Sequence, residues 1–155
     1  MFSSLTRIMR THGLSATDSW FNRIYSNYLN DNPSWNKQFS SELLNYCLFY
    51  FAHSNLSIDS IPVTISQHKT AHIFEVVCIT DIENSVNKQD ISTSQTLLLD
   101  LTDGHNIYQA VEQVYCPILR QNDLIGKKVL ITGVSINPSA SMILLQPEQI
   151  TVLSS

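Results

Sequence analysis

Two pairs of side chains have spacings that metal binding or acid–base chemistry can use. His68 and His72 stand four residues apart, as two zinc ligands on one helix face would. The residues between them include no glutamate and lead into an apolar run typical of a strand, so we discount a metal site here. Asp100 and Asp103 could act as paired carboxylates, but Asp103 precedes a glycine in a turn, where aspartate most often bonds its own backbone.

The sequence contains no other catalytic pattern. It has no Ser/His/Asp order with a nucleophile elbow, and its four glycines form no Gly-rich phosphate loop. The three cysteines, Cys47, Cys78 and Cys116, never form a Cys-x-x-Cys pair. That pattern favours free buried thiols in a reducing compartment over a disulfide framework or a zinc site. We therefore predict no enzymatic activity, no cofactor and no bound metal.

Basic residues give a weak signal for nucleic-acid binding. Lys127 and Lys128 form the one adjacent basic pair and are the candidate contacts, with a solvated strand end as the simpler interpretation. Residues 1–60 are neutral overall, whereas residues 61–155 carry five basic and nine acidic side chains. Because nucleic-acid affinity depends on neutralised phosphates and exposed aromatic rings, this acidic region is predicted to be a poor DNA binder by itself.

Helices are predicted in the first third of the chain. Apolar side chains recur at helical spacing over residues 20–29, and the Asp-Asn-Pro sequence at 31–33 ends this helix. Ser15–Asp18 is close to a capping box at its start. Ser34 is the predicted N-cap of a second helix, which is apolar around much of its circumference and should lie between neighbours. Residues 55–62 are predicted to form a linker.

The first 17 residues permit two interpretations. They contain Arg7, Arg10 and no acidic residue, with apolar residues at helical spacing. An organelle presequence has this composition, and so does an amphipathic helix that packs on the next one. The rest of the chain favours the helix, which leaves an organellar protein as the weaker alternative. No apolar run approaches the ~20 residues that a membrane helix needs.

The remainder of the chain has the pattern of short strands. Residues 72–80 form an apolar run typical of a central strand. Two β-like runs flank Asp103-Gly104, which is among the strongest hairpin signals. Further runs lie between Gly126 and Gly133 and on either side of Pro147. These runs predict a compact antiparallel barrel, with Leu99 facing its interior.

The connection between the first two predicted strands is long and polar. It extends from residue 81 to 94, whereas hairpin connections usually take two to about five residues. Long loops between strands are often functional. Ile82, Val86 and Ile91 could serve as apolar anchors for a partner, and Lys88 lies among them. Equally, the three apolar residues could tuck the loop against the barrel.

These elements resemble the N-terminal region of the RecQ-mediated genome instability protein family. The matching stretches are WFNRIYSNYL (20–29), HIFEVVCITDI (72–82), LLLDLTDG (97–104), GKKVLITG (126–133) and LLQPEQITVL (144–153). The structural motif within them comprises Leu101, Thr102, Asp103, Gly104, Gly126 and Gly133. The resemblance implies an α+β fold, with an N-terminal helical bundle (residues 1–60) followed by a five-stranded antiparallel oligonucleotide/oligosaccharide-binding-fold (OB-fold) barrel (residues 61–155).

The resemblance also implies a function. Such a chain would be a noncatalytic accessory subunit of a nuclear complex of a RecQ helicase and topoisomerase III, acting in DNA repair, recombination and replication. It would bind topoisomerase III, stabilise its open gate, and promote decatenation and double Holliday junction dissolution, contacting DNA mainly through the complex. In the family, an insertion between the first two barrel strands reaches the gate; the corresponding loop here is short. The alternative is an OB-fold protein that binds single-stranded nucleic acid directly.

Overall fold

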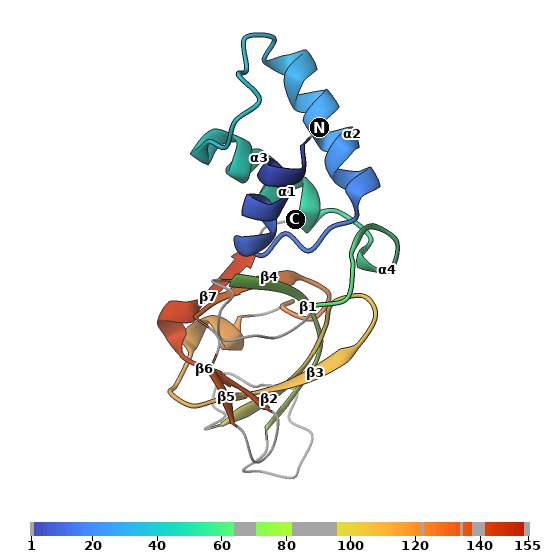
Figure 1. The fold of residues 1–155 in the computed structure, drawn as a ribbon. Coiled ribbons are helices and arrows are strands. Elements are labelled where there is room, and N and C mark those ends of the chain that lie inside the picture. Colours follow the sequence, from blue (N-terminus) through green and yellow to red (C-terminus); the bar gives the residue numbers. More distant parts are fainter. Residues whose placement is uncertain are drawn as a thin grey trace.

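The computed structural model describes residues 2–63, 71–81, 96–121, 123–133, 135–137 and 142–153. The helical part contains α1 (Ser3–Thr11), α2 (Asp18–Asp31), α3 (Ser41–Ala52) and α4 (Leu56–Asp59). The sheet part contains β1 (Ala71–Asp81), β2 (Leu97–Thr102), β3 (Ile107–Glu112), η1 (Pro117–Arg120), β4 (Lys128–Thr132), β5 (Ser135–Asn137), β6 (Met142–Leu145), η2 (Pro147–Gln149) and β7 (Ile150–Leu153). Figure 1 shows the helices stacked on one end of a curled sheet.

The helix starts differ from the prediction because other hydroxyl groups cap them. Helix α2 is confirmed, but its N-cap is Thr17, whose hydroxyl accepts a hydrogen bond from the Trp20 N–H (3.2 Å). Helix α3 begins only at Ser41, with Ser40 as the cap, so the predicted cap at Ser34 is wrong. Lys37 lies between the two positions with φ 63°, a left-handed conformation that a helix from residue 34 could not contain.

The helices enclose an aromatic core, but they do not enclose all of α3. The buried side chains of this cluster include Trp20, Phe21, Tyr25 and Phe51. The ring of Trp20 meets the edges of Phe21 and Phe51, each at 5.2 Å between centroids. The opposite side of α3 is open, since Phe49 is 57% exposed. The prediction of a sandwiched second helix is therefore wrong for that side.

The sheet has seven strands in the order β5-β6-β3-β2-β1-β4-β7, not the five predicted. All pairs are antiparallel except β3 with β6, so the expectation of a purely antiparallel barrel is also wrong. The predicted closing run is interrupted at Pro147, and its halves pair with opposite ends of the sheet: β6 with β3, and β7 with β4. Strand β6 runs parallel to β3, and β7 runs antiparallel to β4. Both halves of the closing run therefore have the same direction as β3. This arrangement curls the sheet, consistent with an OB-fold (Figure 1).

The interior of the sheet is aliphatic, and its strand phase is the predicted one. Leu97, Leu99 and Leu101 are at most 1% exposed and belong to the buried cluster inside the sheet. A β-bulge between Val76 and Cys78 interrupts the pairing of β1 with β2. Cys78 is exposed beyond this bulge, so the expectation of buried thiols is wrong for this residue.

The other two cysteines are free and buried, as expected. Burial raises the pKa of Cys47 to about 12 and that of Cys116 to about 11. Both thiols are therefore protonated and unreactive near neutral pH.

The helices cover one outer face of the sheet. Ile73 of β1 points away from the interior and belongs to the helical core, at 3% exposed. Leu130 of β4 and Leu153 of β7 pack against the same core. The two parts thus share apolar contacts, and a domain boundary at residue 60 stays a prediction. Among the described residues, no helix has the length and apolarity needed to cross a membrane.

Candidate partner-binding surface

The predicted loop residues Ile82, Val86, Lys88 and Ile91 lie outside the described residues. The structure does describe the two strand ends that this connection joins. Asp81, the last residue of β1, faces Leu97, the first of β2, in the antiparallel register. The candidate site is therefore built from the surface around Asp81 and Leu97.

Three aliphatic residues form a row across the outer face of the sheet, one residue from those strand ends. The register places Leu98 of β2 beside Val111 of β3, and Val111 beside Leu144 of β6. All three are half-buried, and neither buried cluster of the described residues includes them. We call Leu98, Val111 and Leu144 the outer row.

The neighbouring row on the same face is polar. Cys78 of β1 faces Asp100 of β2, and Asp100 faces Gln109 of β3. Outward positions of a solvated sheet are normally of this kind. Along β2 and β3, this polar row separates the outer row from Ile107, an exposed apolar residue at the far end of β3.

A buried ion pair fixes the end of β3 beside the outer row. Arg120 on η1 donates to both carboxylate oxygens of Glu112, and the bond from Nη2 to Oε1 is 2.7 Å long. Glu112 also accepts from the backbone N–H groups of Leu97 (2.9 Å) and Cys116 (2.7 Å). The hydrogen bond with Glu112 raises the pKa of Arg120 and outweighs its burial. One carboxylate therefore ties the start of β2 to the segment after β3.

Two exposed apolar side chains follow β3 in the chain, next to this ion pair. Val114 is 50% exposed and Tyr115 is 53% exposed. The Tyr115 ring lies under the guanidinium of Arg120, with 4.0 Å from Cζ to the ring centroid. The backbone N–H of Val114 points to the Leu145 carbonyl at the end of β6 (3.4 Å). The outer row together with Val114 and Tyr115 is called the rim patch below.

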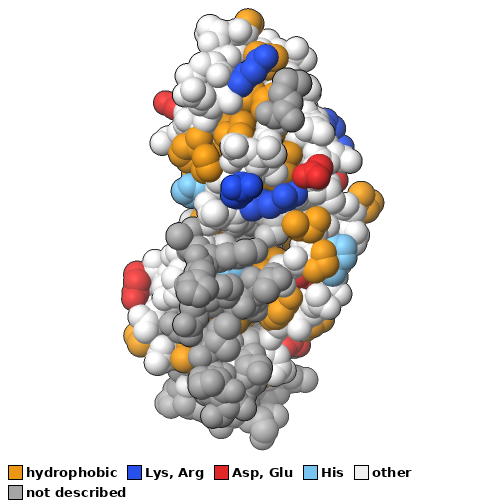
Figure 2. Space-filling model, viewed as in Figure 1, with side chains coloured by type: hydrophobic (Ala, Val, Ile, Leu, Met, Phe, Trp, Pro, Cys, Tyr) orange, Lys and Arg blue, Asp and Glu red, His pale blue; other side chains and the backbone are white. Residues whose placement is uncertain are grey.

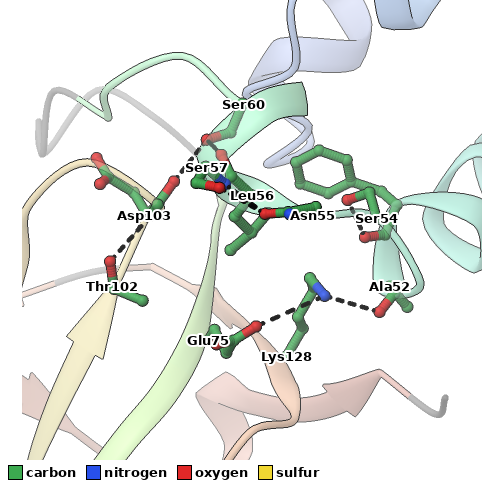
Figure 3. A network of polar contacts seen from close by, with 12 residues as sticks. Ala52, Ser54, Asn55, Leu56, Ser57, Ser60, Glu75, Thr102, Asp103 and Lys128 are labelled. Atoms are coloured by element: carbon green, nitrogen blue, oxygen red, sulfur yellow. Dashed lines mark hydrogen bonds and ion pairs between the residues drawn. The ribbon is translucent and has the colours of Figure 1, made fainter.

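The Asp103-Gly104 turn is not part of the rim patch. It attaches the barrel to the helices. The Asp103 carboxylate accepts from the N–H groups of His105 (2.8 Å) and Asn106 (2.7 Å), which confirms that it bonds its own turn. It also accepts from the N–H of Val63 (2.7 Å) in the segment after α4. Ser60 donates its hydroxyl to the Asp103 carbonyl at 2.6 Å (Figure 3). The predicted turn residue is therefore an attachment point.

Its hydrogen bonds keep the Asp103 carboxyl ionised. Burial alone would raise the pKa of Asp103, which is 1% exposed. The backbone donors of Val63, Asn106 and His105 outweigh burial, and the pKa of Asp103 is lowered. The negative charge of Asp103 is thus stabilised by hydrogen bonds inside the protein.

Gly104 fits this attachment for a steric reason. Its φ of 97° is in the left-handed region, and a Cβ at this position would lie 2.3 Å from the carbonyl oxygen of Leu56 on α4. Gly126 also has a positive φ (89°), but a Cβ there would meet nothing within 4 Å. Two glycines of the predicted motif therefore differ in kind: Gly104 allows a close approach, whereas Gly126 allows only a turn.

Lys128 is not the solvated strand end that the sequence suggested. It is 6% exposed, and its ammonium donates to the carbonyl of Ala52 at the end of α3 (3.0 Å) and lies 3.8 Å from a carboxylate oxygen of Glu75 (Figure 3). This lysine makes a second attachment between the barrel and the helices. Lys127 is half-buried beside it, and its role in nucleic-acid binding stays a prediction.

The remaining candidates for chemistry form no joint site among the residues that the structure describes. His72 is completely buried in β1, and His68 lies outside the described residues. Within the described ranges, no three His, Cys, Asp or Glu side chains are close enough to hold a metal ion. Asp100 is half-buried on the outer face, on the strand that leads into the Asp103 turn, and Asp103 is committed to backbone donors.

Sequence reasoning missed the outer row and the Glu112–Arg120 pair. A signal for the row exists in the three consecutive leucines at 97–99, since alternate residues of a strand point to opposite faces and one of three must point outward. The ion pair had no such signal, because eight residues and a change of element separate its members.

The chain matches a known protein family. A family model described as RMI1, N-terminal OB-fold domain, matches residues 52–155. This range begins at the last residue of α3 and includes α4, the whole sheet and the Asp103 attachment. No curated protein matches the chain.

Proposed function

Because the chain belongs to the RMI1 family, the RecQ-mediated genome instability proteins, we propose that it is the accessory subunit of a RecQ helicase–topoisomerase III complex. Family membership itself carries a noncatalytic accessory role in genome maintenance. The finer proposal is that the chain binds topoisomerase III in the nucleus, stabilises its open gate, and promotes decatenation and double Holliday junction dissolution.

The outer row is the observation that supports this proposal most directly. Leu98, Val111 and Leu144 lie on the strand 2–strand 3 side of the sheet, which is where OB-folds commonly bind their ligands. A row of aliphatic side chains with a ring at its end suits a protein surface better than a nucleic acid, because protein interfaces concentrate their energy in a few apolar anchors. The row also borders the strand ends that lead into the predicted partner-binding loop.

The charge of this part of the molecule agrees with a basic partner. Among the described residues of the sheet part, Asp123 and Glu148 are exposed and Asp100 is half-buried. Arg120 and Lys128 are buried in internal contacts, which leaves the half-buried Lys127 as the basic side chain of these residues that reaches the surface. Complementary charge would steer a DNA-binding enzyme toward this surface and favour correct docking.

A pull-down with two matched variants tests the proposed surface. The complete chain should retain purified topoisomerase III and stimulate decatenation of linked DNA circles. Leu98→Asp places a charge in the outer row and should abolish retention while the protein still melts cooperatively. Ile107→Asp is the control, because Ile107 is also apolar and lies at the far end of β3, at 59% exposed. Equal retention by both variants would exclude the outer row as the contact.

The loop between β1 and β2 is tested separately. Replacing residues 82–94 with a short Gly-containing turn should leave the sheet folded, because the strand ends on both sides remain paired. Retention of topoisomerase III should persist through the rim patch, while stimulation of decatenation should fall. Undiminished decatenation would remove the loop from the proposed mechanism.

A further inference from the structure

A groove of about 650 Å³ lies between α1 and α2, on the helical part and away from the rim patch. Its volume is in the range of small-molecule binding sites. Side chains of both helices line it, including Phe2, Thr6, Arg7, Arg10, Asp18 and Asn22. The groove thus combines guanidinium, hydroxyl and amide groups with one aromatic ring and one carboxylate.

The two arginines stand one helical turn apart on α1 and differ in what they already bind. Arg10 donates from Nη2 to the Ala16 carbonyl (2.9 Å) and to the Asp18 carboxylate (3.0 Å), which holds its guanidinium in place. Its Nε is buried without a hydrogen-bond partner. Arg7 is exposed and makes no hydrogen bond or ion pair with the described residues. One cation is therefore pre-positioned, and the other is available.

The ring of Phe2 forms a fixed apolar wall of the groove. It stacks on Trp35 with 6.1 Å between centroids and 7° between planes, and it also contacts Tyr25 at 4.9 Å. Thr6, next to it in the groove, is held by a hydrogen bond between its hydroxyl and that of Tyr25 (3.1 Å). A wall whose side chains are already packed loses little conformational entropy when a ligand binds.

The exposed cations of the described residues gather on the helices. Arg7, Arg23 and Lys37 are exposed there, and Arg10 is half-buried. In the face drawn in Figure 2, the Lys and Arg side chains lie over the helical half of the molecule. The sheet part, in contrast, uses Arg120 and Lys128 internally. A polyanion would therefore meet the helices before it meets the barrel.

We propose that the α1–α2 groove binds one nucleotide of single-stranded nucleic acid. Arg7 and Arg10 would hold a phosphate, and the Phe2 wall would contact the unpaired base or its sugar. Single-strand sites combine these two features, a cationic track and aromatic side chains. An unpaired strand fits better than a duplex, because the groove has the size of one small ligand and a duplex keeps its bases stacked inside. This site is independent of topoisomerase III binding.

Binding of a fluorescein-labelled thymidine oligonucleotide to the complete chain, measured by anisotropy over a series of salt concentrations, tests the site. Arg7→Ala should weaken binding about ten-fold, as expected for the loss of a hydrogen bond between charged groups. It should also reduce the slope of log K against log salt by about 0.7, the value of one phosphate contact on a single strand. Arg7→Lys should keep most of that slope, and the melting temperature of both variants should equal that of the wild type.

Two variants are the controls. Lys37→Ala removes one exposed charge from the helical part outside the groove, and Lys127→Ala removes one half-buried charge from the barrel. Each should change affinity less than two-fold. A loss with Lys37→Ala as large as that with Arg7→Ala would show diffuse attraction instead of a site, and a loss confined to Lys127→Ala would place binding on the barrel.

Three further results would overturn the proposal. These are undetectable binding of the oligonucleotide by the wild-type chain at low salt, equal affinity for a blunt duplex of the same length, and displacement of the oligonucleotide by a phosphoserine peptide at a lower concentration than by unlabelled oligonucleotide. The last would identify the groove as a phosphopeptide site. Because topoisomerase III is absent from the assay, its outcome does not depend on the proposed accessory function.

Discussion

The sheet has two outward-facing apolar surfaces, and they differ in what lies over them. On the β1–β4–β7 side, Ile73, Leu130 and Leu153 pack into the core formed by the helices. On the β2–β3–β6 side, Leu98, Val111 and Leu144 form a similar aliphatic row, on which no described helix packs. The helices thus cover one surface within the chain, and we expect a partner to cover the other. Apolar outward positions of a sheet indicate docking surfaces in both cases.

The attachments around the covered surface explain why the helices stay there. The Asp103 turn is bonded to the segment after α4, and Lys128 is bonded to the end of α3. These polar ties lie on either side of Glu75 of β1, which pairs with Thr102 and with Lys128, and they involve buried groups, which are costly to leave unpaired. The family match, which begins at residue 52, includes the partners of both ties. The helical part thus behaves as a fixed cover of the barrel.

The largest effect is expected from placing a charge on the covered surface. Ile73→Asp should destabilise the protein by about 5 kcal/mol, since Ile73 is buried and a lone carboxylate would have no partner there. Leu98→Asp, on the other surface, should cost less than about 1 kcal/mol because its side chain reaches water. Urea unfolding of both variants measures the difference. Similar losses of stability would mean that the two surfaces are equally buried, and the comparison would fail.

A smaller loss is expected from breaking the ion pair beside the outer row. Arg120→Met leaves the buried Glu112 carboxylate without its cation and should cost about 3 kcal/mol. Glu112 would keep its two backbone donors, so the end of β3 should loosen without unfolding the covered surface. The double variant Glu112→Gln/Arg120→Met is the control, and it should recover part of the loss. Calorimetry that shows no difference between wild type and Arg120→Met would contradict this role of the pair.

The two surfaces also mark what could be predicted from the sequence. The hairpin, the inward phase of Leu99 and the interruption at Pro147 follow from local patterns, and the structure confirms all three. The parallel β3–β6 pair and the burial of Lys128 depend on where distant segments meet. A lysine in a polar sequence carries no sign that the end of a helix 76 residues away offers it a carbonyl. Local patterns therefore indicated the strands, but not which outward surface would be covered.

A methyl group added at Gly104, where the barrel meets α4, should destabilise the protein more than one added at Gly126. Gly104→Ala should cost about 2–3 kcal/mol, because positive φ and the close approach of Leu56 both oppose a Cβ. Gly126→Ala has the same backbone penalty and open space, so about 1 kcal/mol is expected. Thermal unfolding of the two variants isolates the cost of pressing α4 away from the turn. Equal shifts in melting temperature would show that the close approach contributes nothing.

The smallest effect concerns the charge that holds the helices over the covered surface. The folded protein lowers the pKa of Asp103 below the ordinary value of about 4, so the unfolded chain binds a proton more readily than the folded one. The stabilisation by this carboxylate is therefore complete above pH about 5 and is lost as the pH falls through the folded-state pKa. Asp103→Asn should cost about 1 kcal/mol at pH 7, where a charged acceptor of three backbone N–H groups is replaced by a neutral one. Unfolding free energies of wild type and variant should converge as the pH falls from 5 toward 3, and a gap that stays constant over this range would show that ionisation of Asp103 does not hold the attachment.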